Sequence, residues 1–247
     1  MNDLIDFIIL GFAQGITEFF PISSSGHLVL FQDFLEINNA GASAEIIAHF
    51  GTLFSILLFY KSSFFANQKS SDFFHFDNLK MLFLSTIPAV LCGLLFDFEI
   101  FFNYEFVKIA LLSNGIFLIL MSALKNSFNF QWNYKTALLL GIFQSIAMLP
   151  GISRSGMVIS SALFLGLDKK QSIQYGFFMV VPVIILSIFY EILFSSGFDA
   201  ISIYAGLALF SSSFIFGYLS LVFLIKFLER FNFWWFGLYC IIISLIL

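Results

Sequence analysis

The run Pro21-Ile22-Ser23-Ser24-Ser25-Gly26 interrupts an apolar stretch that extends over residues 4–34. A second run, Pro150-Gly151-Ile152-Ser153-Arg154-Ser155-Gly156, interrupts residues 136–167 in the same way. A helix needs about 20 mainly apolar residues to span a bilayer, so each half is too short to do so comfortably. Proline, glycine and hydroxyls at mid-depth are typical of a re-entrant hairpin of two helices. The alternative at each break is a kinked spanning helix.

The composition places these breaks in an integral membrane protein. Hydrophobic residues make up 60% of the 247 residues and charged residues 11%, against about 45–50% and 25% in soluble chains. A soluble core cannot bury that much apolar surface. A nucleic-acid binder is excluded, because no basic patch exists to neutralise a run of phosphates.

Six further apolar runs are long enough, or nearly long enough, to span a bilayer. They cover residues 46–60, 79–96, 106–124, 173–194, 201–225 and 233–247. The sequence therefore predicts an all-α integral membrane protein with six spanning helices and two re-entrant helical hairpins. Nothing resembles a linker, so we expect one polytopic domain over residues 1–247.

The charges follow this layout. One face collects the basic residues Lys61, Lys69, Lys80, Lys125, Lys135, Lys169, Lys170, Lys226 and Arg230. The opposite face carries Lys108 and the acidic residues Asp33, Glu36, Glu45, Asp97, Glu99, Glu105 and Asp199. Since cytoplasmic loops are enriched in Lys and Arg, we expect the termini to face outward. The first hairpin then enters from outside and the second from the cytoplasm.

The two broken segments also align with each other at a constant offset of 130 residues. The identical pairs are Gly11/Gly141, Gln14/Gln144, Ile16/Ile146, Ile22/Ile152, Ser23/Ser153, Ser25/Ser155 and Gly26/Gly156. Three predicted spans lie between the copies, so the copies must be inverted. The sequence thus predicts an inverted-topology repeat with halves of roughly residues 1–124 and 136–247, an architecture common in membrane transport.

We expect a new helix to begin at each break, and the N-termini of these two helices to point at each other. Ser23, Ser24 or Ser25 can cap the first helix, and Ser153 or Ser155 the second. Free backbone N–H groups and the helix dipole make such ends an anion site. The predicted phosphate-binding set is Ser23, Ser25, Gly26, Ser153, Ser155 and Gly156. Arg154 adds a planar fork suited to phosphate oxygens, although it could instead form a buried ion pair.

Other candidate groups lie near the first break. Gln14 and Glu18 share one helix face at i, i+4 spacing, and Glu18 could hold a divalent cation, act as a base, or pair with Arg154. His27 follows the serines, and an imidazole can move a proton near neutral pH. His49 is expected only to pack, and His75 to be solvated. Together these groups predict phosphoryl chemistry on a lipid-soluble substrate.

Both segments resemble the undecaprenyl-diphosphatase family, also called the bacitracin-resistance protein BacA. Residues 14–27, QGITEFFPISSSGH, resemble the family's [E/Q]xxxE element followed by PVSS[ST]GH. Residues 150–156, PGISRSG, resemble its PGxSRSG element. Weaker echoes are Phe50-Gly51-Thr52, Gly166-Leu167-Asp168 and Tyr175-Gly176-Phe177-Phe178.

The resemblance implies a multi-pass hydrolase of the bacterial inner membrane, with its active site open to the periplasmic side. Such an enzyme cleaves the phosphoric anhydride of undecaprenyl diphosphate, recycles the carrier lipid for peptidoglycan synthesis and cell shape, and confers bacitracin resistance. The residues carried over as catalytic are Glu18, Ser24, His27 and Arg154. A divalent cation, Mg²⁺ or Ca²⁺, is expected on Glu18 and Gln14.

Three departures and several open questions accompany the resemblance. Gln14 stands where many members have Glu, Val158 where Thr is usual, and Gln174 where Glu is frequent. The nucleophile stays open between Ser24 and water, and the oligomeric state between a monomer and a homodimer. The alternative functions are a lipid transporter or flippase, and a lipid phosphatase of the acid-phosphatase type. The latter needs an Arg-Pro element that this chain lacks.

Overall fold

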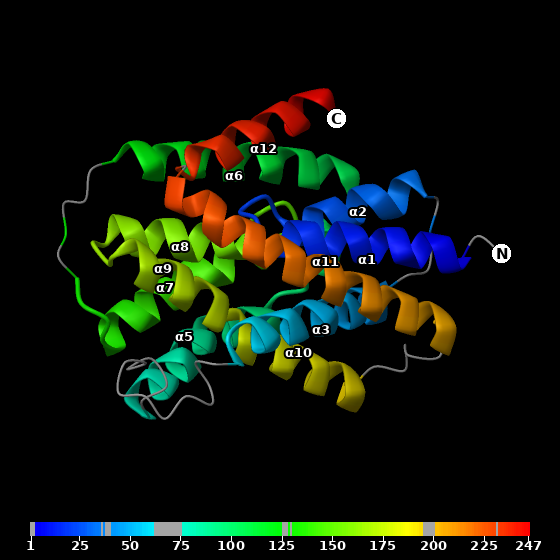
Figure 1. The fold of residues 1–247 in the computed structure, drawn as a ribbon, viewed down its shortest axis with the longest axis horizontal. Helices are drawn as coiled ribbons and strands as arrows, with labels where there is room; N and C mark the ends of the chain where they lie inside the picture. Colours follow the sequence, from blue (N-terminus) through cyan, green and yellow to red (C-terminus); the bar gives the residue numbers. More distant parts are fainter. Residues whose placement is uncertain are drawn as a thin grey trace.

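The computed structural model describes residues 3–35, 37, 41–61, 76–124, 128, 130–194, 201–230 and 232–247. All regular structure in this part of the chain is helical, as the sequence predicted (Figure 1). In chain order the elements are α1 (Asp3–Phe19), α2 (Ser24–Phe34), α3 (Gly41–Phe59), α5 (Phe76–Leu95), η2 (Glu99–Phe101), α6 (Tyr104–Ala123), α7 (Tyr134–Ile146), α8 (Arg154–Phe164), α9 (Lys169–Phe178), α10 (Val180–Phe194), α11 (Ile203–Arg230) and α12 (Trp234–Ile246).

Six helical stretches in the described part of the chain are apolar along most of their length. Tyr104–Ala123, Lys169–Tyr190 and Ile203–Leu228 are long and apolar enough to cross a membrane, and the second of these joins α9 to α10. Ala44–Phe59, Leu79–Leu95 and Trp234–Ile246 are shorter. Large apolar side chains such as Ile109, Leu207 and Phe223 are exposed on these helices, as expected where lipid replaces water. The prediction of an all-α membrane protein is confirmed at this level.

The chain reverses direction at both breaks. α1 and α2 pack against each other and approach the middle of the molecule from the end that carries the N-terminus (Figure 1). α7 and α8 also pack against each other, and they approach the middle from the opposite end. The two turns therefore meet inside the bundle, so that groups from distant parts of the sequence can share one site.

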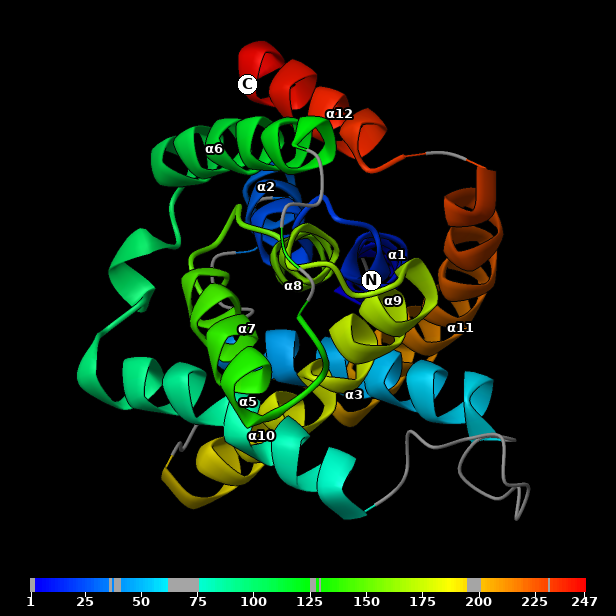
Figure 2. The same cartoon turned by 90° about the vertical axis from the view of Figure 1, so that its left-hand side faces the viewer.

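The surrounding helices hold these hairpins in place. α1 packs along α11, α7 packs along α5, and α6 pairs with α12. Viewed end-on, α8 lies near the centre, with α6 and α12 on one side and α3, α5 and α10 on another (Figure 2). Gly115 and Gly237 allow the close α6–α12 contact, because a Cβ on Gly115 would lie 2.6 Å from the Gly237 carbonyl oxygen. Small residues at such contacts are typical of membrane helices.

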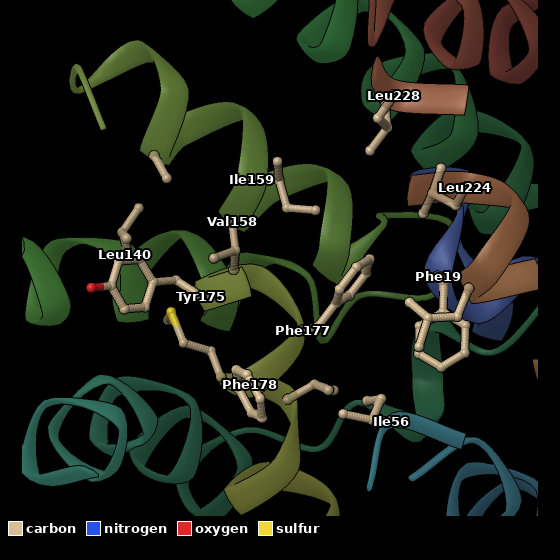
Figure 3. Close-up of a cluster of buried hydrophobic side chains, with 14 of the residues drawn as sticks. Phe19, Ile56, Leu140, Val158, Ile159, Tyr175, Phe177, Phe178, Leu224 and Leu228 are labelled. Carbon is tan, nitrogen blue, oxygen red and sulfur yellow. The ribbon is translucent and has the colours of Figure 1, made fainter. Parts of the chain in front are cut away.

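One large hydrophobic cluster fixes the end of α1 against the second hairpin. Phe19 lies edge-on to Phe177 of α9, with ring centroids 5.5 Å apart. Ile159 of α8 and Phe178 of α9 belong to the same cluster (Figure 3). Since Phe19 follows Glu18 directly, this packing sets where the Glu18 carboxylate lies. Val158, the departure noted above, also packs in this cluster, so its side chain lies away from the polar groups of the breaks.

Candidate active site

A pocket opens where the two breaks meet. Its polar lining comes from the end of α1, the beginnings of α2 and α8, and α3: Glu18, Ser24, Ser25, Glu45, His49, Ser153 and Arg154. Its apolar lining residues are Phe102, Ala147, Met148 and Ile152. A pocket lined by both charged and apolar side chains can hold a charged headgroup attached to a hydrocarbon chain.

Of the serines expected to cap the two new helices, one caps each helix. Ser23 caps α2 by accepting the Gly26 N–H at 3.2 Å, and Ser153 caps α8 by accepting the Gly156 N–H at 3.1 Å. These bonds occupy the N–H groups of Gly26 and Gly156, which were expected to bind phosphate. Ser155 bonds instead to the Ser153 hydroxyl at 3.1 Å. Of the predicted phosphate-binding set, only Ser25 and Ser153 line the pocket.

The two breaks touch each other directly. The Gly151 N–H donates to the Ser23 hydroxyl at 3.0 Å, across 128 residues of sequence. A Cβ on Gly26 would lie 2.9 Å from the Cα of Gly151, so only glycine permits this approach. Gly151 has a φ of 97°, and Ser23 has a φ of 70°, a conformation that is uncommon for residues other than glycine. Such backbone strain persists where the surrounding contacts impose it.

Glu18 and Ser24 form a hydrogen-bonded pair on the polar side of the pocket. The Ser24 hydroxyl donates to Glu18 Oε2 at 2.5 Å, and the Gln14 amide nitrogen donates to the same oxygen at 2.9 Å. The Glu18 side chain is only 7% exposed. A carboxylate that already accepts the bond of a serine hydroxyl is placed to take its proton.

His49 lies in this cluster, so the expectation that it only packs was wrong. Its Nδ1 lies 2.7 Å from the Gln14 amide nitrogen and 3.4 Å from Glu18 Oε2. Its Nε2 lies 3.6 Å from Glu45 Oε1. The sequence did carry a signal, since Glu45 and His49 are spaced i, i+4 and share one helix face. No local pattern, however, showed that this face of α3 meets α1.

His27 lies outside the pocket, contrary to the expectation that it faces the site beside Ser24. Its Nδ1 donates to the Ser23 carbonyl oxygen at 2.7 Å. Its Nε2 is 2.9 Å from the Tyr239 hydroxyl, and the two rings stack with their centroids 5.8 Å apart. Because a carbonyl can only accept, Nδ1 carries a proton, and Nε2 can accept the Tyr239 hydroxyl. The Ser23 carbonyl and Tyr239 thus orient the His27 ring, whereas the bond to Glu18 orients the Ser24 hydroxyl.

Arg154 supplies the positive charge. It lines the pocket, and its Nη1 is buried without a hydrogen-bond partner in the described part of the chain. Among the described residues Glu18 makes its hydrogen bonds with Ser24 and Gln14, and no direct ion pair joins it to Arg154. A buried guanidinium nitrogen without an acceptor is costly. An anionic ligand in the pocket would satisfy it.

Two oxygen atoms, one from Glu18 and one from Gln14, are available to the expected cation, although of these two residues only Glu18 lines the pocket. Gln14 Oε1 is buried without a partner, and the hydrogen bonds of Glu18 among the described residues all use Oε2. No group of three or more His, Cys, Asp or Glu side chains within the described ranges could hold a metal ion. Mg²⁺ is commonly held by one or two carboxylates plus substrate phosphates. One carboxylate and one amide oxygen fit that mode of binding.

Comparison with known proteins places this site in a family. The family model of the bacitracin resistance protein BacA matches residues 7–246. An undecaprenyl-diphosphatase of Christiangramia forsetii is 34% identical over 98% of this chain and 96% of its own length. One of Borrelia recurrentis is 32% identical over 100% of this chain and 98% of its own length. Undecaprenyl-diphosphatase 1 of Bacillus licheniformis is 38% identical over 73% of this chain and 72% of its own length.

Proposed function

Since the chain belongs to the family of the bacitracin resistance protein BacA, we propose that it hydrolyses undecaprenyl diphosphate to undecaprenyl phosphate and inorganic phosphate. The observation that carries this proposal is the pocket itself, which is lined both by the Ser24–Glu18 pair and by Arg154, whose Nη1 has no partner among the described residues. The product is the carrier lipid of cell-wall synthesis, and its recycling accounts for bacitracin resistance. The substrate is a membrane lipid, and the mixture of charged and apolar side chains that line the pocket supports this.

The reaction begins at the Ser24–Glu18 pair. The Ser24 oxygen, or a water held beside it, attacks the terminal phosphorus while Glu18 accepts the proton of the nucleophile. The bond between the terminal phosphorus and the bridging oxygen breaks, and that oxygen leaves on the prenyl phosphate. If Ser24 attacks, a water molecule then hydrolyses the phosphoserine ester. Either route consumes one water molecule and releases inorganic phosphate.

Arg154 and the beginning of α8 stabilise the charge on the transferred phosphoryl group. The guanidinium can offer two parallel N–H donors to phosphate oxygens. Positive charge fixed in a poorly hydrated pocket stabilises the transition state without reorganising. A divalent cation on Glu18 Oε1 and Gln14 Oε1 would neutralise part of the diphosphate charge.

The two histidines have different parts in this proposal. His49 contacts Gln14 and Glu18 directly, and it holds the Glu18 carboxylate at the pocket. His27 reaches the site through the Ser23 backbone, with Tyr239 as its second partner. We therefore assign His27 to positioning the first break, in place of the proton transfer that its sequence position indicated.

We also propose that the six apolar stretches all span and that the two hairpins are re-entrant, in one domain built as an inverted repeat. One correspondence between the halves supports this proposal: α1 packs along α11 as α7 packs along α5. A Cβ on Gly26 would contact Gly151, and a Cβ on Gly156 would contact Pro21. These two contacts correspond, because Gly156 follows Gly26, and Gly151 follows Pro21, by the same offset of 130 residues. The homodimer stays a prediction, and one chain is enough to build the pocket.

The proposed orientation places the lysines at one set of helix ends on the cytoplasmic side of the membrane. The end of α3, the beginnings of α7 and α9 and the end of α11 gather at one end of the structure, opposite both termini (Figure 1). Lys61, Lys135, Lys169 and Lys226 belong to or follow these helix ends. Lys69, Lys125, Glu36 and Asp199 lie outside the described residues.

Labelling tests this orientation. In a cysteine-free background, a cysteine replacing the exposed Ile100 should react with an impermeant maleimide added from outside. A cysteine replacing Lys61 should react only after permeabilisation. The reverse pattern would refute the periplasmic site.

Turnover by the purified protein tests the function. Detergent-solubilised protein given a polyprenyl diphosphate should release inorganic phosphate, and Ser24→Ala and Glu18→Gln should each lower the rate. Removing a positioned proton-transfer group typically costs about 10²–10⁴ in rate. Ser113→Ala is the control, since Ser113 only bonds within its own exposed helix face. The transporter alternative predicts lipid movement between vesicle leaflets without phosphate release, and that result would overturn the proposal.

A further inference from the structure

Asn114 of α6 connects the two breaks, although it lies in neither of them. Its side chain is fully buried. Its Nδ2 donates to the Pro21 carbonyl oxygen at 3.1 Å, and its Oδ1 accepts the Ser153 N–H at 3.1 Å. Pro21 belongs to the first break and Ser153 to the second. One amide group therefore bonds to the backbones of both.

The chemistry of the amide explains this position. A primary amide can donate and accept at the same time from one planar group. The first break presents a carbonyl that needs a donor, and the second presents an N–H that needs an acceptor. Each would otherwise be a buried backbone group without a strong partner, because the nearest alternative for the Pro21 oxygen is Cys240 Sγ at 3.9 Å. A carboxylate cannot donate the first bond, and an apolar side chain can make neither.

The two breaks carry different parts of the proposed reaction. Pro21 lies three residues before Ser24, whose hydroxyl is bonded to Glu18. Ser153 is adjacent to Arg154, whose guanidinium faces the same pocket. The hydroxyl and the guanidinium are on separate helices that begin at the two breaks. Their relative position thus depends on the contacts that join the breaks, of which the Asn114 bridge is one and the Gly151–Ser23 bond is another.

We propose that Asn114 is a positioning residue that aligns the Ser24 hydroxyl with the Arg154 guanidinium by clamping the backbones of the two breaks together. This inference rests on the hydrolase function proposed above. Asn114 does not line the pocket, so it acts through the breaks and not on the substrate. Loss of the bridge leaves each break with its own binding groups and removes their alignment.

The alignment predicts a separation of kinetic constants. A misplacement of about 1 Å can cost about 10²-fold in rate. Asn114→Leu has similar volume and no hydrogen-bonding group, so kcat should fall by about that factor while KM changes little. The matched control is Ser244→Ala, which removes a bond from α12 to the Lys108 carbonyl on the same helix α6, a bond that includes no group of either break. It should lower the thermal midpoint and leave kcat unchanged.

The experiment measures kcat, KM and thermal midpoint for the wild type and both variants, with backbone hydrogen exchange over residues 147–157. Faster exchange at Ser153 in Asn114→Leu, with a lower kcat and near-normal KM, supports the proposal. A folded Asn114→Leu protein with wild-type kcat, or with unchanged exchange, overturns it. If Asn114→Leu does not fold, Asn114→Ser is judged by the same criteria. A wild type that releases no phosphate refutes the hydrolase function instead, and the exchange measurement then decides whether the bridge holds the breaks.

Discussion

Arg154→Lys tests whether the guanidinium fork binds the transferred phosphate. Lysine keeps the positive charge and loses the planar pair of donors. In the structure Nη1 has no partner among the described residues, so no protein–protein bond of that nitrogen is lost. The variant should therefore fold with a nearly unchanged thermal midpoint. The loss should appear in the reaction.

The size of the effect follows from one missing bond. A hydrogen bond to a charged group contributes about 1.5–3 kcal/mol, and each 1.36 kcal/mol is a factor of ten in rate, so kcat/KM should fall by about 10- to 150-fold. Arg154→Met removes the charge as well and should lose more. Lys135→Arg, an exposed substitution at the beginning of α7, is the control outside the pocket.

The assay is phosphate release from a polyprenyl diphosphate by detergent-purified protein, with the thermal midpoint measured on the same preparations. An Arg154→Lys enzyme that turns over at the wild-type rate would show that the fork is not used. Equal losses in the Lys and Met variants, accompanied by a large fall in thermal midpoint, would show that Arg154 serves the fold instead.

Three further substitutions test other parts of the site. Gly26→Ala should cost about 1–3 kcal/mol of stability through overpacking against Gly151. Gly206→Ala on α11 should be neutral or stabilising, because its Cβ would make only ordinary van der Waals contacts, the nearest at 3.7 Å. Equal effects of the two substitutions on the thermal midpoint would contradict the close contact of the breaks. Gln14→Glu adds a second carboxylate, so it should lower the Mg²⁺ concentration needed for half-maximal activity. It should also increase the thermal stabilisation by Mg²⁺ alone. If neither quantity changes, Gln14 does not belong to the cation site. His27→Ala should lower both the thermal midpoint and kcat, because it removes bonds to Ser23 and Tyr239; unchanged stability with an altered pH–rate profile would restore the proton-transfer role to His27.

Much of the architecture could be predicted because it is written in local patterns. The excess of apolar residues identifies a membrane protein without any knowledge of the fold. The Pro–Gly–Ser runs mark where helices stop and start, and the structure begins α2 at Ser24 and α8 at Arg154. The two motifs were enough to identify the family. Each of these inferences needs only a few adjacent residues and the physics of a helix in lipid.

Part of the site could also be anticipated, because the motifs concentrate chemistry. Glu18, Ser24, Ser25, Ser153 and Arg154 were all candidates, and all line one pocket. We could predict their convergence from the repeat that the two motifs form in the sequence. The hydrogen-bond partner of each polar group could not be predicted in this way. The N–H groups of Gly26 and Gly156, for example, bond to the capping serines instead of staying free.

The choice between the histidines was made only by tertiary structure. In sequence, His27 sits beside the serines and His49 lies 22 residues further on, yet His49 contacts Glu18 and His27 contacts Tyr239. Which face of α3 meets α1, and which end of α12 meets α2, depends on packing between helices that are distant in sequence. Packing between distant helices likewise gives Asn114, a polar residue in an apolar run, its partners in the two breaks. A hydrogen-bond donor or acceptor acquires its partner from the fold, and short-range patterns cannot specify one that comes from the other half of the chain.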